Sequence, residues 1–142
     1  MNTRKLSSKQ EKRIAKSIGG IQVIGSGSTP FLKGDVTTSD LFIEAKTKAV
    51  ESRSITVKKD WLEKAKEQSY SMRKRDYALA ISFGDGKDYY VIEDTLMEEL
   101  YKCRAALEAI IDGLGGLEDP LVELPDLKAS GVRSLIRRKL GQ

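Results

Sequence analysis

The sequence predicts an α/β (α+β) fold, a sandwich in which helices flank a central mixed β-sheet. Its hydrophobic periodicity reads in the order helix, three strands, helix, two strands, helix, and such an order is typical of a mixed sheet. The chain has 142 residues, 39% hydrophobic and 32% charged. That length and composition fit one globular domain with a core of its own.

The first predicted element is an amphipathic helix over residues 8–18. Ser8 followed by Glu11 fits a capping box, in which the two side chains satisfy the free backbone N–H groups at the start of a helix. Gly19 and Gly20 are typical of a helix end.

Three short strands are expected next, over residues 21–24, 34–38 and 41–47. A Gly/Ser-rich loop over residues 25–30 separates the first strand from the second. A turn near Ser39-Asp40 would join the second strand to the third as a hairpin.

The second half begins with a helix over residues 58–73 that places apolar side chains at helical spacing. Strands over residues 77–83 and 89–92 follow, joined by the glycine-rich turn 84–87, which is a strong hairpin signal.

Thr95 can cap a further helix over residues 96–111. Residues 114–127 are expected to be a loop and residues 130–140 a short basic helix. We therefore predict a core domain over residues 1–112 and a C-terminal extension over residues 113–142.

The residue inventory excludes several kinds of site. The chain has no histidine, which excludes a Ser-His-Asp triad, a Cys-His pair and an imidazole base. Its single cysteine, Cys103, excludes an internal disulfide and cysteine-cluster metal sites. A metal would have to be bound mainly by oxygen atoms, which indicates magnesium, manganese or calcium.

No apolar run approaches the roughly 18 residues that span a bilayer. Residues 1–16 are basic and polar without an apolar stretch behind them, so no secretory signal is expected there. Together with the free thiol of Cys103, this favours a reduced, cytoplasmic setting and no membrane partner.

Charge is unevenly distributed along the chain, although the net charge is only +4. Residues 1–34 carry seven Lys/Arg against one acid, and residues 46–76 carry ten against five. Residues 85–126 carry three against twelve, and residues 128–142 carry five and no acid. Basic segments favour a polyanionic partner such as nucleic acid. The alternative is a set of ordinary solvated helix faces.

Asp35, Glu44 and Lys46 form the first candidate site. Side chains alternate along a strand, so Glu44 and Lys46 share one face of the strand 41–47. A hairpin turn near Ser39-Asp40 would bring Asp35 close to Glu44. Two carboxylates can bind a hard divalent cation, and an ammonium can neutralise phosphoryl oxygens. The alternative is a solvent-facing charge pair between Glu44 and Lys46.

Two further polar side chains lie on helix faces that should pack inward. Glu11 shares its face with Ile14 and Ile18, and Gln68 shares its face with Trp61 and Met72. Each side chain could turn toward the same site. The alternatives are the capping box for Glu11 and the edge of a core for Gln68.

Taken together, these residues resemble the PD-(D/E)XK nuclease superfamily in the run Glu11 … Gly34-Asp35-Val36 … Ile43-Glu44-Ala45-Lys46. Gly34 stands where the motif has proline. The resemblance covers about residues 7–93, and it implies a restriction-endonuclease-like core. The small size, the early helix and the Gly/Ser-rich loop look like the archaeal-type Holliday junction resolvases and their phage relatives.

The resemblance implies Mg²⁺-dependent hydrolysis of a DNA phosphodiester, with Mn²⁺ as a substitute ion. Asp35, Glu44 and Glu11 would bind the metal, Lys46 would assist the attacking water, and Gln68 would support the site. Further residues could contact DNA: Ser26, Ser28, Lys33, Lys48, Arg73, Lys74 and Arg75. For each of these the alternative is a plain turn or a solvated side chain.

The resemblance also implies a symmetric homodimer, since paired cuts in a four-way junction need paired sites. Three hypotheses stay open at this point. The chain is a structure-specific endodeoxyribonuclease in recombination or repair, a non-catalytic DNA-binding module of the same fold, or a structural protein whose acidic segment docks on a basic partner. Restriction-like and other repair nucleases remain alternatives within the first hypothesis.

Overall fold

The computed structural model describes residues 3–23 and 35–113. Its elements are α1 (Thr3–Ile18), β1 (Ile21–Val23), β2 (Asp35–Thr37), β3 (Leu41–Thr47), α2 (Lys59–Ser71), β4 (Asp76–Ser82), β5 (Tyr89–Val91) and α3 (Asp94–Gly113). The chain divides into two compact units, residues 1–94 and residues 95–142. The first unit holds the sheet, α1 and α2, and it is an α+β fold as predicted.

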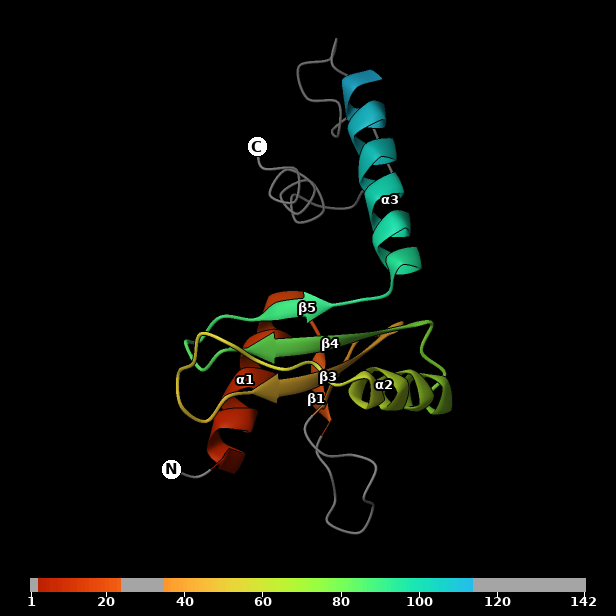
Figure 1. The fold of residues 1–142 in the computed structure, drawn as a ribbon. Helices are drawn as coiled ribbons and strands as arrows, with labels where there is room; N and C mark the ends of the chain where they lie inside the picture. The colour runs from red at the N-terminus through yellow and green to blue at the C-terminus, as the bar shows by residue number, and fades with distance from the viewer. Residues whose placement is uncertain (1–2, 24–34, 114–142) are drawn as a thin grey trace. The chain divides into compact units, whose positions relative to one another are not determined.

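Five strands form one mixed sheet in the order β1-β2-β3-β4-β5 (Figure 1). The first three pair antiparallel, β3 and β4 pair parallel, and β5 pairs antiparallel with β4. A parallel pair needs a crossover between its strands, and α2 supplies it. The glycine-rich turn after β4 returns the chain into β5, as the sequence predicts.

Helices cover both faces of this sheet. On one face, Ile14 of α1 packs with Val36 and Ile43 in a fully buried cluster. On the other face, Ala65 of α2 packs with Phe42 and Tyr77. Adjacent residues of β3 therefore point into different cores, because side chains alternate along a strand. The central strands are buried on both sides, so a polar side chain placed there loses its water.

The helix α1 begins five residues earlier than predicted. Ser8 lies inside the helix, so the predicted capping box of Ser8 and Glu11 is wrong. Arg4, Lys5 and Leu6 are good helix formers, and they extend the helix beyond the serine. The predicted end is confirmed, since Gly19 has a φ of 68° that favours glycine.

Gly20 allows β1 to approach β2 closely. A Cβ atom at this position would lie only 2.8 Å from the carbonyl oxygen of Thr37. A residue with a side chain would therefore push the two strands apart at the edge of the sheet.

In the second unit, the structure describes α3. This helix begins at Asp94, so Thr95 lies within it and is not the predicted cap. The predicted loop over residues 114–127 and the predicted helix over residues 130–140 lie outside the described residues, and the extent of a core over residues 1–112 stays a prediction. None of the described helices is long and apolar enough to cross a membrane.

Candidate active site

Asp35 and Glu44 face each other across the β2–β3 hairpin. The register pairs these two residues directly, which confirms the geometry expected from a turn near Ser39-Asp40. Opposed residues of an antiparallel pair have their Cβ atoms about 5 Å apart. A slip of one residue would move either carboxylate to the other face of the sheet, so the register is what brings them together.

The hairpin turn is held by the side chain of Thr38. Its hydroxyl accepts a hydrogen bond from the backbone N–H of Leu41 at 3.0 Å and donates one to Asp40 Oδ1 at 3.0 Å. The backbone N–H of Thr38 also donates to the carbonyl oxygen of Leu41 at 2.9 Å. These local bonds fix the turn and therefore the pairing of Asp35 with Glu44.

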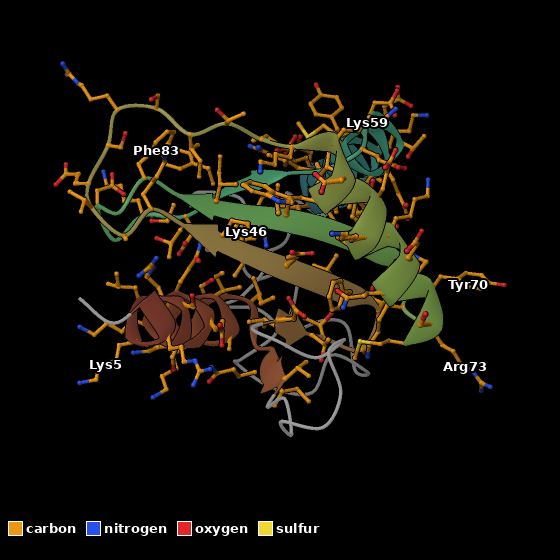
Figure 2. The ribbon with its side chains drawn as sticks, turned by 60° about the horizontal axis from the view of Figure 1, so that its bottom comes forward. Lys5, Lys46, Lys59, Tyr70, Arg73 and Phe83 are labelled. Carbon is orange, nitrogen blue, oxygen red and sulfur yellow. The ribbon has the colours of Figure 1, made fainter. Side chains whose placement is uncertain are left out.

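Lys46 lies two residues beyond Glu44 on the same face. Its Nζ atom is 2.9 Å from Glu44 Oε1 and 5.1 Å from the centre of the Trp61 ring (Figure 2 labels Lys46). The ammonium is thus held by a carboxylate and by a cation–π contact with α2. Lys46 is one-third exposed and Glu44 is 14% exposed, so this pair is shielded from water more than an ordinary surface pair.

Glu11 is buried on the inner face of α1, with 5% of its surface exposed. The Nε2 atom of Gln22 on β1 donates a hydrogen bond to Glu11 Oε2. The carboxylate therefore points toward the edge of the sheet that carries β1 and β2. The sequence left two roles open for Glu11, a helix cap and a side chain of the candidate site. The structure excludes the cap and places Glu11 as a buried acid beside the hairpin.

The neighbouring charges disturb the ionisation of Asp35. Asp35 is 2% exposed, and its burial, with the negative charges of Glu44 and Glu11, raises its pKa to about 8. The positive charge of Lys46 opposes this rise with a smaller effect. A carboxyl group with such a pKa keeps its proton at neutral pH unless a cation takes the proton's place.

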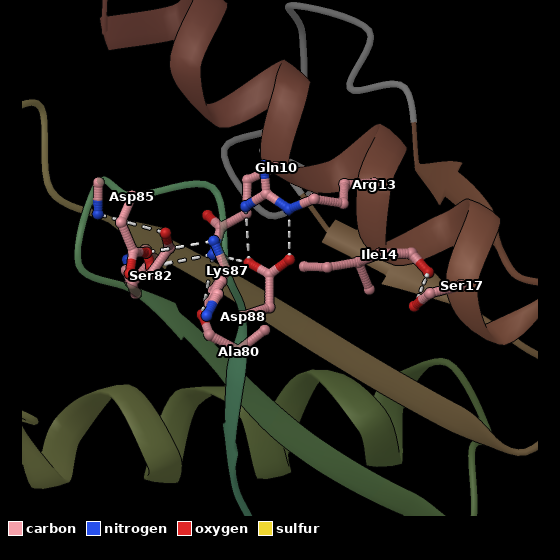
Figure 3. A network of polar contacts seen from close by, with 11 residues as sticks. Gln10, Arg13, Ile14, Ser17, Ala80, Ser82, Asp85, Lys87 and Asp88 are labelled. Carbon is pink, nitrogen blue, oxygen red and sulfur yellow. Dashed lines mark hydrogen bonds and ion pairs between the residues drawn. The ribbon is translucent and has the colours of Figure 1, made fainter.

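A polar network fixes α1, and with it Glu11, against the sheet. Gln10 donates from Nε2 to the carbonyl oxygen of Lys46 at 3.1 Å and to Asp88 Oδ1 at 3.2 Å (Figure 3). Arg13 donates two hydrogen bonds to the Asp88 carboxylate, at 2.6 and 2.9 Å. The residue next to Glu11 is therefore bonded directly to the backbone of Lys46.

Gln68 lies half-buried on the face of α2 that packs on the sheet, between the buried Ala65 and the packed Met72. This confirms the predicted face of the helix, and its supporting role stays a prediction. Lys48 is exposed just after β3.

The three basic residues after α2 have different surroundings. Arg73 is exposed, Arg75 pairs with Asp76 at 3.0 Å, and Lys74 donates to the carbonyl oxygen of Thr38 at 2.6 Å. Lys74 thus has a structural contact that competes with its predicted contact to DNA. Ser26, Ser28 and Lys33 lie outside the described residues.

The carboxylate oxygens of the candidate site suit a hard cation, but they do not surround a single point in space. Over residues 3–23 and 35–113, no three acidic or cysteine side chains stand close enough to hold a metal ion as they are placed. Magnesium is commonly bound by only one or two carboxylates, with water and substrate phosphate completing its shell. The opposed pair of Asp35 and Glu44 meets that lesser requirement.

Sequence reasoning missed the neighbours that hold the candidate site in place. Gln22 contacts Glu11, and Trp61 contacts Lys46. Both contacts depend on the packing of distant segments, which local spacing does not encode. Gln10 carried a signal, since a glutamine next to an inward-facing Glu11 on an amphipathic helix has to find buried partners.

Comparison with known proteins identifies no family for this chain. The chain matches no family model, and it shows no significant similarity to a curated protein or to a solved structure.

Proposed function

We propose that the protein is a metal-dependent endodeoxyribonuclease of the PD-(D/E)XK type, with a restriction-endonuclease-like core. We propose branched DNA, and a four-way junction in particular, as its substrate. One observation carries the proposal: Asp35 lies directly opposite Glu44, while Lys46 holds Glu44 on the same sheet face at 2.9 Å. The order acid, acid, lysine on two paired strands is the pattern that the sequence motif requires.

Burial of these acids supports a functional reading over a structural one. A carboxyl group with 2% exposure and a pKa of about 8 destabilises the folded protein at neutral pH, because folding must keep it protonated or leave an unfavourable charge. A cation between Asp35 and Glu44 would remove that penalty. Surface charge pairs, the alternative for Glu44 and Lys46, do not carry such a penalty.

In this proposal Asp35 and Glu44 bind Mg²⁺, or Mn²⁺ in its place, and Glu11 orients the ion or its water ligands. A bound divalent cation lowers the pKa of water and stabilises the charge that develops on the phosphate. Lys46 lies beside Glu44, where its ammonium can position the attacking water and neutralise a phosphoryl oxygen. Trp61 and Glu44 keep that ammonium in one place.

A homodimer is part of the proposal, since symmetric cuts need two sites. The helix α3 has no buried residue in the described part of the chain. It exposes a set of large apolar side chains: Met97, Leu100, Tyr101, Leu107 and Ile110. An exposed apolar set of this kind favours association with another protein surface.

A cleavage panel tests the proposal. Labelled four-way junction, nicked duplex, flap, plain duplex and single-stranded DNA are incubated with Mg²⁺, with Mn²⁺ and with EDTA. Paired cuts in the junction, absent in EDTA and in Lys46→Ala, support the resolvase. Cuts in another substrate with the same dependence keep the nuclease and refute the resolvase.

Lys59→Ala is the matched control, because Lys59 is 88% exposed in a loose pair with Glu63 at 3.8 Å. It should leave the rate unchanged. Intact DNA binding without cutting in either metal would refute the nuclease and identify a binding module.

A further inference from the structure

A basic hollow lies at the end of α2, outside the candidate active site. Its volume is about 680 Å³, and it is lined by Tyr70, Ser71, Arg73, Lys74 and Arg75. No acidic residue of the described segments lines it. The hollow is wide and open to solvent, and its lining combines cations, hydroxyl groups and one aromatic ring.

The backbone at Arg73 has a conformation that favours glycine. Arg73 has a φ of 54°, and no other non-glycine residue in the described segments has a positive φ. It stands directly after the last turn of α2, where helices commonly place a glycine. Glycine would adopt this conformation more easily, so the arginine needs another reason.

Tyr70 is the second unusual residue of the hollow. It is 86% exposed, the largest exposed fraction among the large hydrophobic side chains in the described residues. Figure 2 shows Tyr70 and Arg73 extending outward from the same end of α2. A tyrosine left in water beside an arginine presents a flat face that can stack on another ring.

Helix packing explains part of this cluster but not all of it. Cations complement the partial negative charge at the C-terminal end of a helix, and Lys74 donates to the carbonyl oxygens of Thr38 and Ser39 at 2.6 and 3.4 Å. Lys74 therefore ties the helix end to the β2–β3 turn. Neither this contact nor the helix dipole explains the exposed ring of Tyr70.

The same contact places the hollow near the candidate active site. The β2–β3 turn leads into β3, and Glu44 lies three residues beyond the first residue of that strand. Three residues of strand span about 10 Å. Successive phosphates of one strand rise by about 3.4 Å along the duplex axis and lie farther apart in an unpaired strand, so this span corresponds to at most about three nucleotides.

We propose that this hollow binds an unpaired nucleotide of the DNA substrate, with its base stacked on Tyr70 and its phosphate held by Arg73. Every base has a flat face that stacks on an aromatic ring, and arginine recognises phosphate through paired N–H donors. Arg75 also lines the hollow, where it pairs with Asp76 at 3.0 Å. The inference rests on the proposed function, since it places an unpaired segment a few nucleotides from the bond to be cut.

Binding without metal tests this inference separately from cleavage. Fluorescence anisotropy in EDTA compares a blunt duplex with a duplex of equal length that carries a single-stranded overhang. The wild-type protein should bind the overhang substrate about 10-fold more tightly, a ratio in the range that one stacked base produces. Tyr70→Ala should remove this preference, and Tyr70→Phe should keep it.

Arg73→Gly removes the side chain and favours the native backbone, so it should fold at least as well as the wild-type protein. It should weaken binding of the overhang substrate at least about five-fold. Tyr89→Ala is the matched control, because Tyr89 is a 49% exposed tyrosine on β5 that lies outside the hollow and outside the apolar set of α3. It should change neither affinity.

Four results would overturn the inference. The first is a wild-type protein that binds the two duplexes equally, and the second is a Tyr70→Ala variant that loses affinity equally for both. The third is an Arg73→Gly variant that binds the overhang substrate as tightly as the wild type. The fourth comes from competition: polyglutamate displaces the overhang substrate as effectively as oligothymidylate does. If the protein prefers the overhang substrate but cuts no DNA, the proposed nuclease is refuted and nucleotide binding in the hollow is supported. Metal-dependent cutting without the overhang preference would support the nuclease and refute nucleotide binding in the hollow.

Discussion

Replacing Asp35 by asparagine should stabilise the metal-free protein, and the gain should grow with pH. Asparagine has nearly the same shape but no charge to bury. The pKa of Asp35 is about 8 in the folded chain, against about 3.9 for an aspartate in the unfolded chain. Between these values the unfolded state has lost a proton that the folded state still holds.

The sign of the pH dependence follows from that difference. The free energy of unfolding of the wild type is highest, as far as Asp35 contributes, below pH 4. It decreases as the pH rises toward 8, by about 1.4 kcal/mol per pH unit for one proton. Four pH units therefore set an upper limit of about 5.6 kcal/mol on this decrease. Asp35→Asn has no such loss, so its advantage should level off above pH 8.

Urea unfolding in EDTA at pH 5, 6.5 and 8 measures the effect, and the fluorescence of Trp61, the single tryptophan of the chain, reports it. We expect the advantage of Asp35→Asn to increase by at least about 2 kcal/mol between pH 5 and pH 8. Asp112→Asn, an exposed aspartate of α3, is the matched control. An advantage that does not change with pH would refute the reasoning.

Two neighbours should shift this pH dependence in opposite directions. The charge of Glu44 raises the pKa of Asp35, so Glu44→Gln should lower that pKa and reduce the pH dependence. The charge of Lys46 lowers the pKa of Asp35, so Lys46→Ala should raise it further. An unchanged pH dependence in both variants would show that burial alone sets the pKa of Asp35.

The remaining predictions concern the metal, the network and the helix end. Millimolar Mg²⁺ should raise the melting temperature of the wild type more at pH 8 than at pH 5, because bound carboxylates must lose their protons, and it should have little effect on Asp35→Asn. A double-mutant cycle of Arg13→Ala and Asp88→Ala in urea unfolding should give a coupling of about 1–2 kcal/mol, reduced from a buried pair because Arg13 is about one-third exposed. A coupling near zero would show that the network does not hold α1. Arg73→Gly should increase the free energy of unfolding by about 1 kcal/mol, and a decrease would show that the arginine stabilises the helix end.

The hairpin that forms the candidate site was predictable because its determinants are local. Alternation in strand 41–47 fixes the face of Glu44 and Lys46, and the turn at Ser39-Asp40 sets their distance from Asp35. Leu41 and Ile43, on the opposite face of this strand, pack toward α1.

The remaining features depend on contacts between segments far apart in the chain. Ser8 fits a cap locally, yet the helix continues through it, since the preceding residues favour helix and α1 packs along the sheet. The stacking of Trp61 on Lys46 depends on how the β3–α2–β4 crossover seats the helix. The unusual pKa of Asp35 depends on burial, which no local pattern encodes.

Single-turnover cleavage of a four-way junction in Mg²⁺ tests the central claim most directly. The wild type is compared with Glu44→Gln and with Glu63→Gln, an exposed glutamate of α2. We predict paired cuts by the wild type and by Glu63→Gln, and a rate at least about 100-fold lower for Glu44→Gln. Equal rates for all three proteins would contradict the assignment of the site to Asp35, Glu44 and Lys46.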